Sequence, residues 1–198
     1  MLLGVDVVLG PLLTLIVYKQ GKKSLRFDLT VIVVLQLIAF SYGMSAVARG
    51  RPAWLVFNAD RFDLVAAQDT DPRHAKDSRP EYRTAPWTGP RWVASRNPDN
   101  VQARNTLLLE SARGGPDLPQ RTDLYLPLAS DAAAVRARAK PLAELERYNT
   151  KAAVAAVEAR WPEATAWLPL MAKAQPMTVL LRASDASVVA VVDLRPWP

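Results

Sequence analysis

An unbroken run of 20 uncharged residues, at positions 29–48, constrains this chain more than any other feature of its sequence. A helix rises about 1.5 Å per residue, so a helix of this length spans roughly 30 Å, the thickness of a bilayer core. The run is rich in β-branched residues, which favour strands in water. In lipid, however, a single segment satisfies its own backbone hydrogen bonds only as a helix. We therefore expect a transmembrane helix at residues 29–48.

A second apolar run precedes this one at residues 2–18 and contains one charge, Asp6, and the pair Gly10-Pro11. It is at the short end of the length that spans a bilayer. Either a kink at Gly10-Pro11 or a missing beginning accounts for that length, because proline breaks the helical hydrogen-bond ladder. We expect residues 1–18 to form an incomplete transmembrane helix.

The connection at residues 19–28 orients the two runs. It carries four basic groups and one acidic group, and basic connections stay in the cytoplasm. A helical hairpin with a cytoplasmic turn places everything after residue 48 outside the inner membrane, on the periplasmic side. A cleaved signal peptide is the alternative, with Ala46-Val47-Ala48 as its cleavage site. Both interpretations put the following domain outside.

Five residues of the two apolar runs are candidate contacts with a partner helix. Small residues let helices approach closely in lipid, which favours Gly4, Gly10 and Gly43, and Pro11 marks a kink beside Gly10. Asp6 is an ionisable group inside a span, and such groups are expensive unless they have a role. A position near the outer end, within reach of water, is the simpler explanation for Asp6.

Composition excludes several classes of function. The net charge of +6 divides into +3 for residues 1–50 and +3 for residues 51–198, and the basic residues of the second part are interspersed with acidic ones. A nucleic-acid binder would concentrate them on one face. The chain has no cysteine and one histidine, His74, which excludes disulfide scaffolds and thiolate or multi-histidine metal sites. We predict no metal and no cofactor.

Residues 51–198 are predicted to form an extracytoplasmic α+β domain. Apolar and alternating patterns predict strands at 53–57, 61–65, 91–95, 166–170, 177–182 and 188–194. Helical patterns lie at 101–112, which Gly114-Gly115 ends, at 132–147, broken by Pro141, and at 150–160. Residues 69–90, with four prolines and His74, are predicted to be a loop. The last strand is apolar on both faces, which predicts a central position. The resulting fold is a small, mainly antiparallel sheet with helices.

No catalytic motif is visible in this domain. Glu144 and Glu146 lie two apart on a predicted helix and do not face each other. Asp60 and Asp63 flank Arg61 and are expected to form a surface ion pair. His74, in a polar loop, is expected to be exposed and without a role. We assign no catalytic residue and expect no enzyme activity.

Short sequence strings along nearly the whole chain resemble the TfpX/TfpZ type of type IV pilin accessory protein. The matching strings are GVDVVLGPLLTLIV at 4–17, KKSLRFDL at 22–29, YG at 42–43, RP at 51–52, VF at 56–57, DRF at 60–62, WTGP at 87–90, GGPDL at 114–118, TVLL at 178–181 and VDLRPW at 192–197. The membrane string is the most specific of them. Members of that family begin with an additional transmembrane helix, and we expect that helix to be missing here.

The resemblance implies an inner-membrane factor for type IV pilus biogenesis that binds a particular pilin without covalent chemistry and supports its assembly or stability, in the manner of a chaperone. Its expected partners are the major type IV pilin and the pilus assembly machinery. It implies no active-site residues. Two other functions stay open from the sequence: a membrane-anchored ligand-sensing domain and a pilin-modifying enzyme. The oligomeric state is not predicted.

Overall fold

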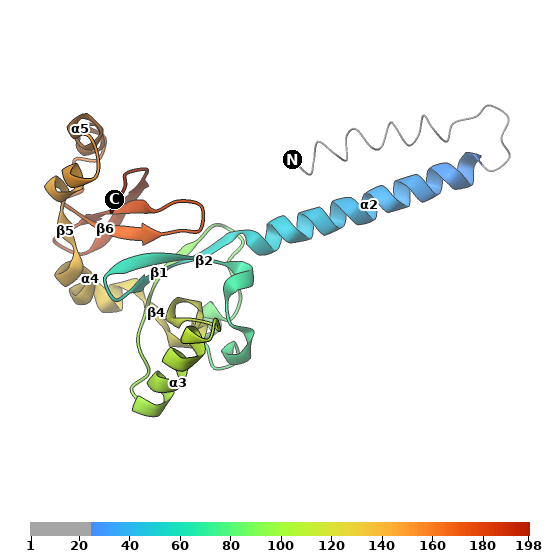
Figure 1. Ribbon diagram of the computed structural model, residues 1–198, viewed down its shortest axis with the longest axis horizontal. Coiled ribbons are helices and arrows are strands. Elements are labelled where there is room, and N and C mark those ends of the chain that lie inside the picture. Colours follow the sequence, from blue (N-terminus) through green and yellow to red (C-terminus); the bar gives the residue numbers. More distant parts are fainter. Residues whose placement is uncertain (1–24) are drawn as a thin grey trace. The chain divides into compact units, whose positions relative to one another are not determined.

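The computed structural model describes residues 25–198 (Figure 1). The chain divides into two compact units, Met1–Arg51 and Pro52–Pro198, each described by itself. The predicted helix at 1–18, most of the turn at 19–28, and Gly4, Asp6, Gly10 and Pro11 lie outside the described residues, so these expectations stay predictions.

The described part of the first unit is one helix, α2 (Leu25–Gly50). It begins before the uncharged run, because Arg26 and Asp28 are already helical. Asp28 in the first turn and Arg49 in the last complement the helix dipole. The helix ends at Gly50, where Pro52 disfavours helical geometry at the residue before it. Within residues 25–198, α2 is the one helix that is long and apolar enough to cross a membrane, judged by length and composition.

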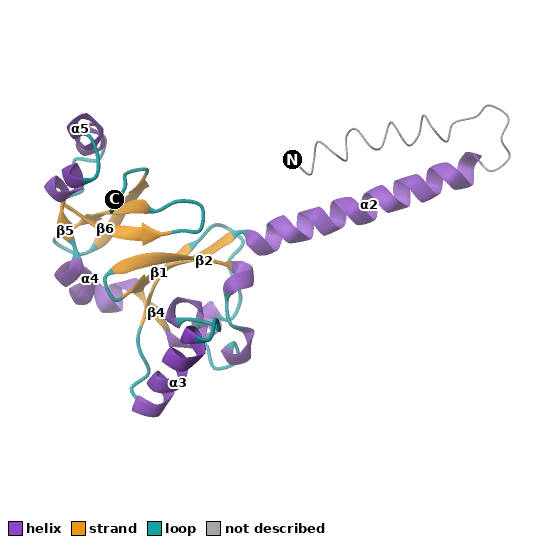
Figure 2. Ribbon diagram, viewed as in Figure 1, coloured by secondary structure: helices purple, strands orange, loops and turns teal. Residues whose placement is uncertain are grey.

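The second unit contains eight strands and three α-helices, connected in part by short 3-10 helices (Figure 2). The strands are β1 (Pro52–Asn58), β2 (Arg61–Ala66), β3 (Arg91–Ser95), β4 (Tyr125–Pro127), β5 (Lys140–Pro141), β6 (Ala166–Met171), β7 (Met177–Arg182) and β8 (Ser187–Val192). The α-helices are α3 (Val101–Ala112), α4 (Ala132–Arg138) and α5 (Lys151–Arg160). The 3-10 helices are η1 (Ala67–Asp69), η2 (Pro72–His74), η3 (Pro80–Tyr82), η4 (Leu118–Gln120), η5 (Thr122–Leu124), η6 (Leu128–Asp131) and η7 (Leu142–Arg147).

The strands form one mixed sheet in the order β4-β3-β1-β2-β6-β7-β8, with β5 beside β6. β1 and β3 are parallel, and so are β2 and β6, whereas the other neighbours are antiparallel. The expectation of a small, mainly antiparallel sheet is therefore wrong. Parallel pairs need crossover connections, and here the segment between β2 and β3 and the long segment between β4 and β6 supply them. The first crossover has no regular helix, so its sequence reads as a loop.

The sheet has two halves with a narrow junction. β2 and β6 are paired only at Phe62↔Leu170 and Asp63↔Met171. Strands β1 to β4 lie on one side of this junction and β5 to β8 on the other. We call these the first and second half-sheets.

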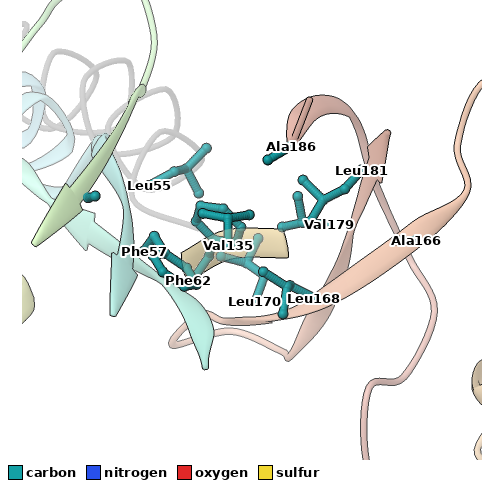
Figure 3. Close-up of a cluster of buried hydrophobic side chains, with 11 residues drawn as sticks. Leu55, Phe57, Phe62, Val135, Ala166, Leu168, Leu170, Val179, Leu181 and Ala186 are labelled. Carbon is teal, nitrogen blue, oxygen red and sulfur yellow. The ribbon is translucent and has the colours of Figure 1, made fainter. Parts of the chain in front are cut away.

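Three apolar clusters hold the domain together. One continuous cluster covers one face of both half-sheets, where Val135 of α4 packs against strand residues such as Phe62, Leu168 and Val179 (Figure 3). On the other face the two half-sheets have separate clusters. Trp54 belongs to the cluster on the first half-sheet, and Trp167 to the one on the second.

Two segments differ from their predicted form. Residues 132–147 form α4, then the short strand β5, then η7. Pro141 does not merely kink a continuous helix here but prevents it from continuing. The last strand, β8, is the outer strand of the sheet rather than a central one. Its apolar residues contact the clusters on both faces, through Val188 on one side and Val189 on the other, which explains the two-sided apolar pattern.

Candidate functional site

The surface of α2 is the first candidate binding surface. Its large apolar side chains are exposed along its length, including Leu35, Ile38, Phe40 and Val47. In water such exposure is costly, whereas a lipid or helix partner removes the cost. Gly43 lies in the second half of α2, and a Cβ built on it meets no heavy atom within 4 Å. The helix backbone at Gly43 is therefore open to close approach.

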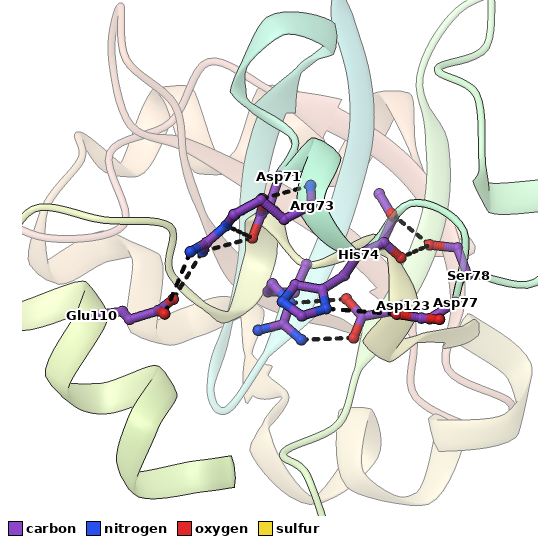
Figure 4. Close-up of polar contacts among 9 residues, drawn as sticks. Asp71, Arg73, His74, Asp77, Ser78, Glu110 and Asp123 are labelled. Carbon is purple, nitrogen blue, oxygen red and sulfur yellow. Dashed lines mark hydrogen bonds and ion pairs between the residues drawn. The ribbon is translucent and has the colours of Figure 1, made fainter.

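The second candidate surface is built on a polar cluster around Arg73 (Figure 4). The Arg73 guanidinium lies between Asp71 and Glu110, with Nη2 at 2.9 Å from Asp71 Oδ2 and 2.8 Å from Glu110 Oε2. Asp71 precedes η2, whereas Glu110 belongs to α3. One side chain thus joins the crossover of the first half-sheet to a helix 37 residues later in the chain.

Local sequence explains why the crossover adopts this form. Asp71 caps η2 by accepting from the Arg73 backbone N–H at 3.0 Å, and Pro72 starts the turn with its fixed φ. The Asp71 N–H donates to the Gln120 carbonyl at 2.8 Å. Ser78 and Thr122, both buried, share a hydrogen bond of 2.7 Å. The crossover is therefore an ordered cover on the first half-sheet rather than an open loop.

In this cluster one guanidinium binds two carboxylates. Hydrogen bonds from Arg73 hold the pKa of Asp71 below its usual value, and they do the same for Glu110. Both carboxylates stay ionised at neutral pH and are occupied by Arg73. His74 lies beside the cluster, half exposed, with Nδ1 at 3.6 Å from Asp77 Oδ2. This arrangement can fix elements in place, but it presents no free base beside a nucleophile.

A second partly buried carboxylate lies at the junction of the half-sheets. Asp63 accepts from Arg61 Nε at 3.1 Å and from Asn58 Nδ2 at 3.4 Å. Burial raises its pKa, and the Arg61 charge only partly offsets this. The predicted pairing of Asp63 with Arg61 is confirmed, although the carboxylate is mostly covered. It lines a hollow of about 180 Å³ together with Asp69 and Lys173, which pair at 2.7 Å. Among residues 25–198 no group of three or more His, Asp or Glu side chains could hold a metal.

The polar cluster positions α3 so that its apolar side chains face outward. Leu107 is the one buried residue of this helix, whereas Val101, Leu108 and Leu109 are 63%, 61% and 57% exposed. Three consecutive leucines cover about 200° of a helix and cannot all face the core. This signal was present in the sequence, but the helical pattern at 101–112 did not say which of the leucines faces the core. We call Val101, Leu108 and Leu109 the α3 patch.

The predicted stop of α3 at Gly114-Gly115 is confirmed. Gly114 has a φ of +82°, the left-handed conformation that glycine adopts without strain. The Gly115 N–H donates to the Glu110 carbonyl at 2.9 Å, and a Cβ there would lie 2.9 Å from the same oxygen. The turn therefore fixes the end of the helix that carries Glu110.

The chain is similar to fimbrial assembly proteins of Dichelobacter nodosus. It is 34% identical to the serogroup I protein over 146 residues, which is 73% of this chain and 56% of that protein. It is 34% identical to the serogroup E1 protein over 151 residues, 75% of this chain and 58% of that protein. It is also 38% identical to the protein of serogroups C1 and C2 over 68 residues, a third of this chain and 52% of that protein.

The chain thus spans a little over half the length of the curated relatives that it matches. No family model matches it, and no solved structure does. The relatives bear the name of assembly proteins rather than of enzymes.

Proposed function

We propose that this chain is an inner-membrane accessory factor for type IV pilus biogenesis that binds a particular pilin without covalent chemistry. The observation that carries the proposal is its 34% identity to fimbrial assembly proteins over three quarters of its length. The resemblance of its membrane string to type IV pilin accessory proteins points to the same process. The paired charges of the described domain support a binding role rather than a catalytic one.

In this proposal α2 is retained in the inner membrane and the domain faces the periplasm. Basic residues cluster at the start of the helix, with Lys19, Lys22 and Lys23 before it and Arg26 in its first turn, which favours a cytoplasmic location for that end. The 26 residues of α2 are enough for a bilayer core with some tilt. The domain begins at Pro52, directly after the helix.

The helical hairpin would bind the apolar helix of a pilin that waits in the membrane. Lipid offers no hydrophobic driving force between helices, so close packing at small residues supplies the attraction. Gly43 is the described candidate, and Gly4, Asp6, Gly10 and Pro11 are the candidates outside the described residues. The α3 patch would contact the soluble part of the same pilin, because its apolar side chains lie on an ordered helix with no cover of their own.

The first test is a clean deletion complemented by the chain. We expect the deletion to lower surface piliation or pilin level, with the cognate pilin affected more than others. Unchanged piliation would count against any role in pilus biogenesis. An unchanged pilin mass in the deletion would separate binding from covalent modification.

The second test identifies the partner by crosslinking and pull-down from membranes. We expect a tagged chain to recover the major pilin and a Gly43→Leu variant to recover much less. Ser41→Leu is the matched control, since it enlarges an exposed small residue about 160° around the helix from Gly43. Recovery of assembly machinery without pilin would move the role to that machinery and contradict the hairpin model.

A further inference from the structure

The start of β1 is the part of the second unit that the chain keeps closest to the end of α2. β1 begins at Pro52, and Arg51 alone separates it from Gly50, the last residue of α2. Two residue steps span at most about 7 Å, however the two units are oriented. With α2 in the membrane, as in the proposed function, the start of β1 therefore lies close to the bilayer surface.

The loop before β3 lies at this same end of the sheet. Trp54 of β1 is paired with Arg91, the first residue of β3, and the two strands run in the same direction. Earlier in the loop, Ala85 packs against the apolar cluster that contains Trp54. Residues 86–90 therefore lie at the end of the sheet where β1 starts, and not at the far end where it finishes.

Trp87, in this loop, is the most exposed large apolar side chain of residues 25–198, at 75%. The other five tryptophans of the chain are buried or half-buried. The chain bends at residues 87–89, where Gly89 has a φ of +109°, a conformation that glycine adopts without strain. A tryptophan ring with an apolar body and a polar N–H is suited to the boundary between membrane and water.

Two exposed arginines, Arg83 and Arg91, flank this loop, and positions 82–98 contain no acidic residue. Arg83 Nε donates to the Ser78 carbonyl at 3.0 Å, and Arg91 Nη1 donates to the Glu81 carbonyl at 3.4 Å. Both guanidinium groups thus donate to backbone carbonyls and keep their positive charge available. Anionic lipid headgroups attract basic residues that lie next to a membrane.

We infer that Trp87 inserts into the headgroup layer of the membrane that holds α2, with Arg83 and Arg91 against anionic headgroups. The inference rests on the proposed anchoring by α2 and goes beyond it, because one connection at Arg51 leaves the direction of the domain open. A second contact with the bilayer fixes that direction. The α3 patch is then presented at a defined orientation to the membrane.

An exposed tryptophan also suits a protein partner, because aromatic side chains are common anchors of protein interfaces. Two observations favour lipid here. The loop lies at the end of the sheet that the chain holds near the bilayer, and its charged neighbours are all basic at positions 82–98.

The absence of cysteine from the chain allows a fluorophore to be placed at one position at a time. The full chain is reconstituted in vesicles of phosphatidylethanolamine and phosphatidylglycerol that contain a lipid with a spin label on its headgroup. We expect a fluorophore at Thr88→Cys, next to Trp87, to be quenched severalfold more than one at Asp60→Cys. Asp60 is the matched control, because it is exposed and follows the far end of β1, roughly 20 Å from its start.

A fluorophore at Ile38→Cys, in the middle of α2, tests the anchor separately, with the spin label placed on the lipid acyl chains. Quenching at Ile38 without quenching at Thr88, or equal quenching at Thr88 and Asp60, would overturn the headgroup contact and leave the proposed function in place. No quenching at Ile38 would reject the membrane anchor and this inference together.

Substitution of the ring tests its own part in the contact. Trp87→Ser in the Thr88→Cys background should lower the quenching severalfold, whereas Trp87→Tyr should retain most of it, since tyrosine also favours the interface. Circular dichroism should be unchanged in both variants, because the ring is exposed. Equal quenching after Trp87→Ser would overturn the inference. So would a photo-crosslinking residue at Trp87 that captures a protein in cells and no lipid.

Discussion

On the face where the two half-sheets have separate apolar clusters, they are covered by different elements and held by different contacts. The crossover and the segment around η4 and η5 cover the first half-sheet, and ion pairs and capping hydrogen bonds hold them there. The second half-sheet is covered by η7 and α5, whose Leu145 and Val154 pack on Trp167. Apolar burial dominates the second cover. The first cover has an apolar cluster of its own, to which Tyr82 of the crossover contributes, and in addition depends on charges that also position α3.

The difference indicates which part of this domain can loosen without global unfolding. A cover held by apolar contacts is lost only with the core beneath it. A cover held partly by charged groups at the surface also responds to pH and salt, since solvent screens such pairs. The α3 patch is attached to the second kind of cover, so the binding surface that we propose lies on the more adjustable half.

The largest expected effect is in the second half-sheet. Trp167→Ala removes a fully buried ring whose Nε1 donates to the Pro141 carbonyl at 2.9 Å. We expect a loss of about 3–5 kcal/mol in the free energy of unfolding. Denaturant unfolding followed by far-UV circular dichroism measures it. A loss below about 1 kcal/mol would break the comparison, because apolar burial would then not dominate this cover.

Arg73→Ala should have a smaller, local effect in the first half-sheet. It leaves the covered carboxylate of Asp71 without its cation and detaches Glu110 of α3. We expect faster hydrogen exchange in α3 and η2, with unchanged protection in β6 and β7. Arg113→Ala is the control, since Arg113 follows the same helix without a part in the cluster. Equal exchange in both variants would show that the cluster does not hold α3.

Acid should loosen the first cover before the second. The pKa of Asp71 is lowered in the folded state, so its contribution to stability is present above the ordinary pKa of an aspartate and is lost as pH falls through the folded-state value. Acid has the opposite effect at Asp63. Its pKa is raised in the folded state, so protonation at low pH removes the cost of burying its charge. Asp71→Asn should therefore flatten the acid side of the stability profile. A profile unchanged by Asp71→Asn would contradict this assignment.

The smallest expected difference is between the two buried tryptophans. Trp54 Nε1 is buried without a hydrogen-bond partner among residues 25–198, whereas Trp167 Nε1 has one. Phenylalanine removes the unsatisfied donor at Trp54 but breaks a hydrogen bond at Trp167. Both variants also lose ring volume, so the comparison isolates the donor. We expect Trp54→Phe to be less destabilising than Trp167→Phe by about 1 kcal/mol in thermal unfolding.

The sequence predicted the local elements well where a pattern is periodic or ends at a strong signal. The strands at β1, β2, β3, β6 and β7, the helices α3 and α5, and the long helix α2 all appear where expected. Strand order and direction were not predictable, because crossover connections without a regular helix look like loops. The predicted central position of the last strand, β8, was wrong for a related reason. An edge strand in contact with clusters on both faces has the same apolar pattern as a central one.

The candidate site was harder to predict than the fold. The Arg73–Glu110 contact joins residues 37 apart, and no local pattern marks such a pairing. The outward direction of Leu108 and Leu109 follows from helix geometry only when the buried side of α3 is known. Gly43 was named from its size alone, and the structure adds that its surroundings on α2 are open.

The most direct test of the proposed function compares two positions on α2 in living cells. A photo-crosslinking residue placed at Gly43 should capture the major pilin in the inner membrane, and the same residue at Ser41 should capture much less. That outcome would identify the Gly43 side as the pilin-binding side. Equal capture at both positions, or pilin capture at neither while the chain is present at its normal level, would contradict the account.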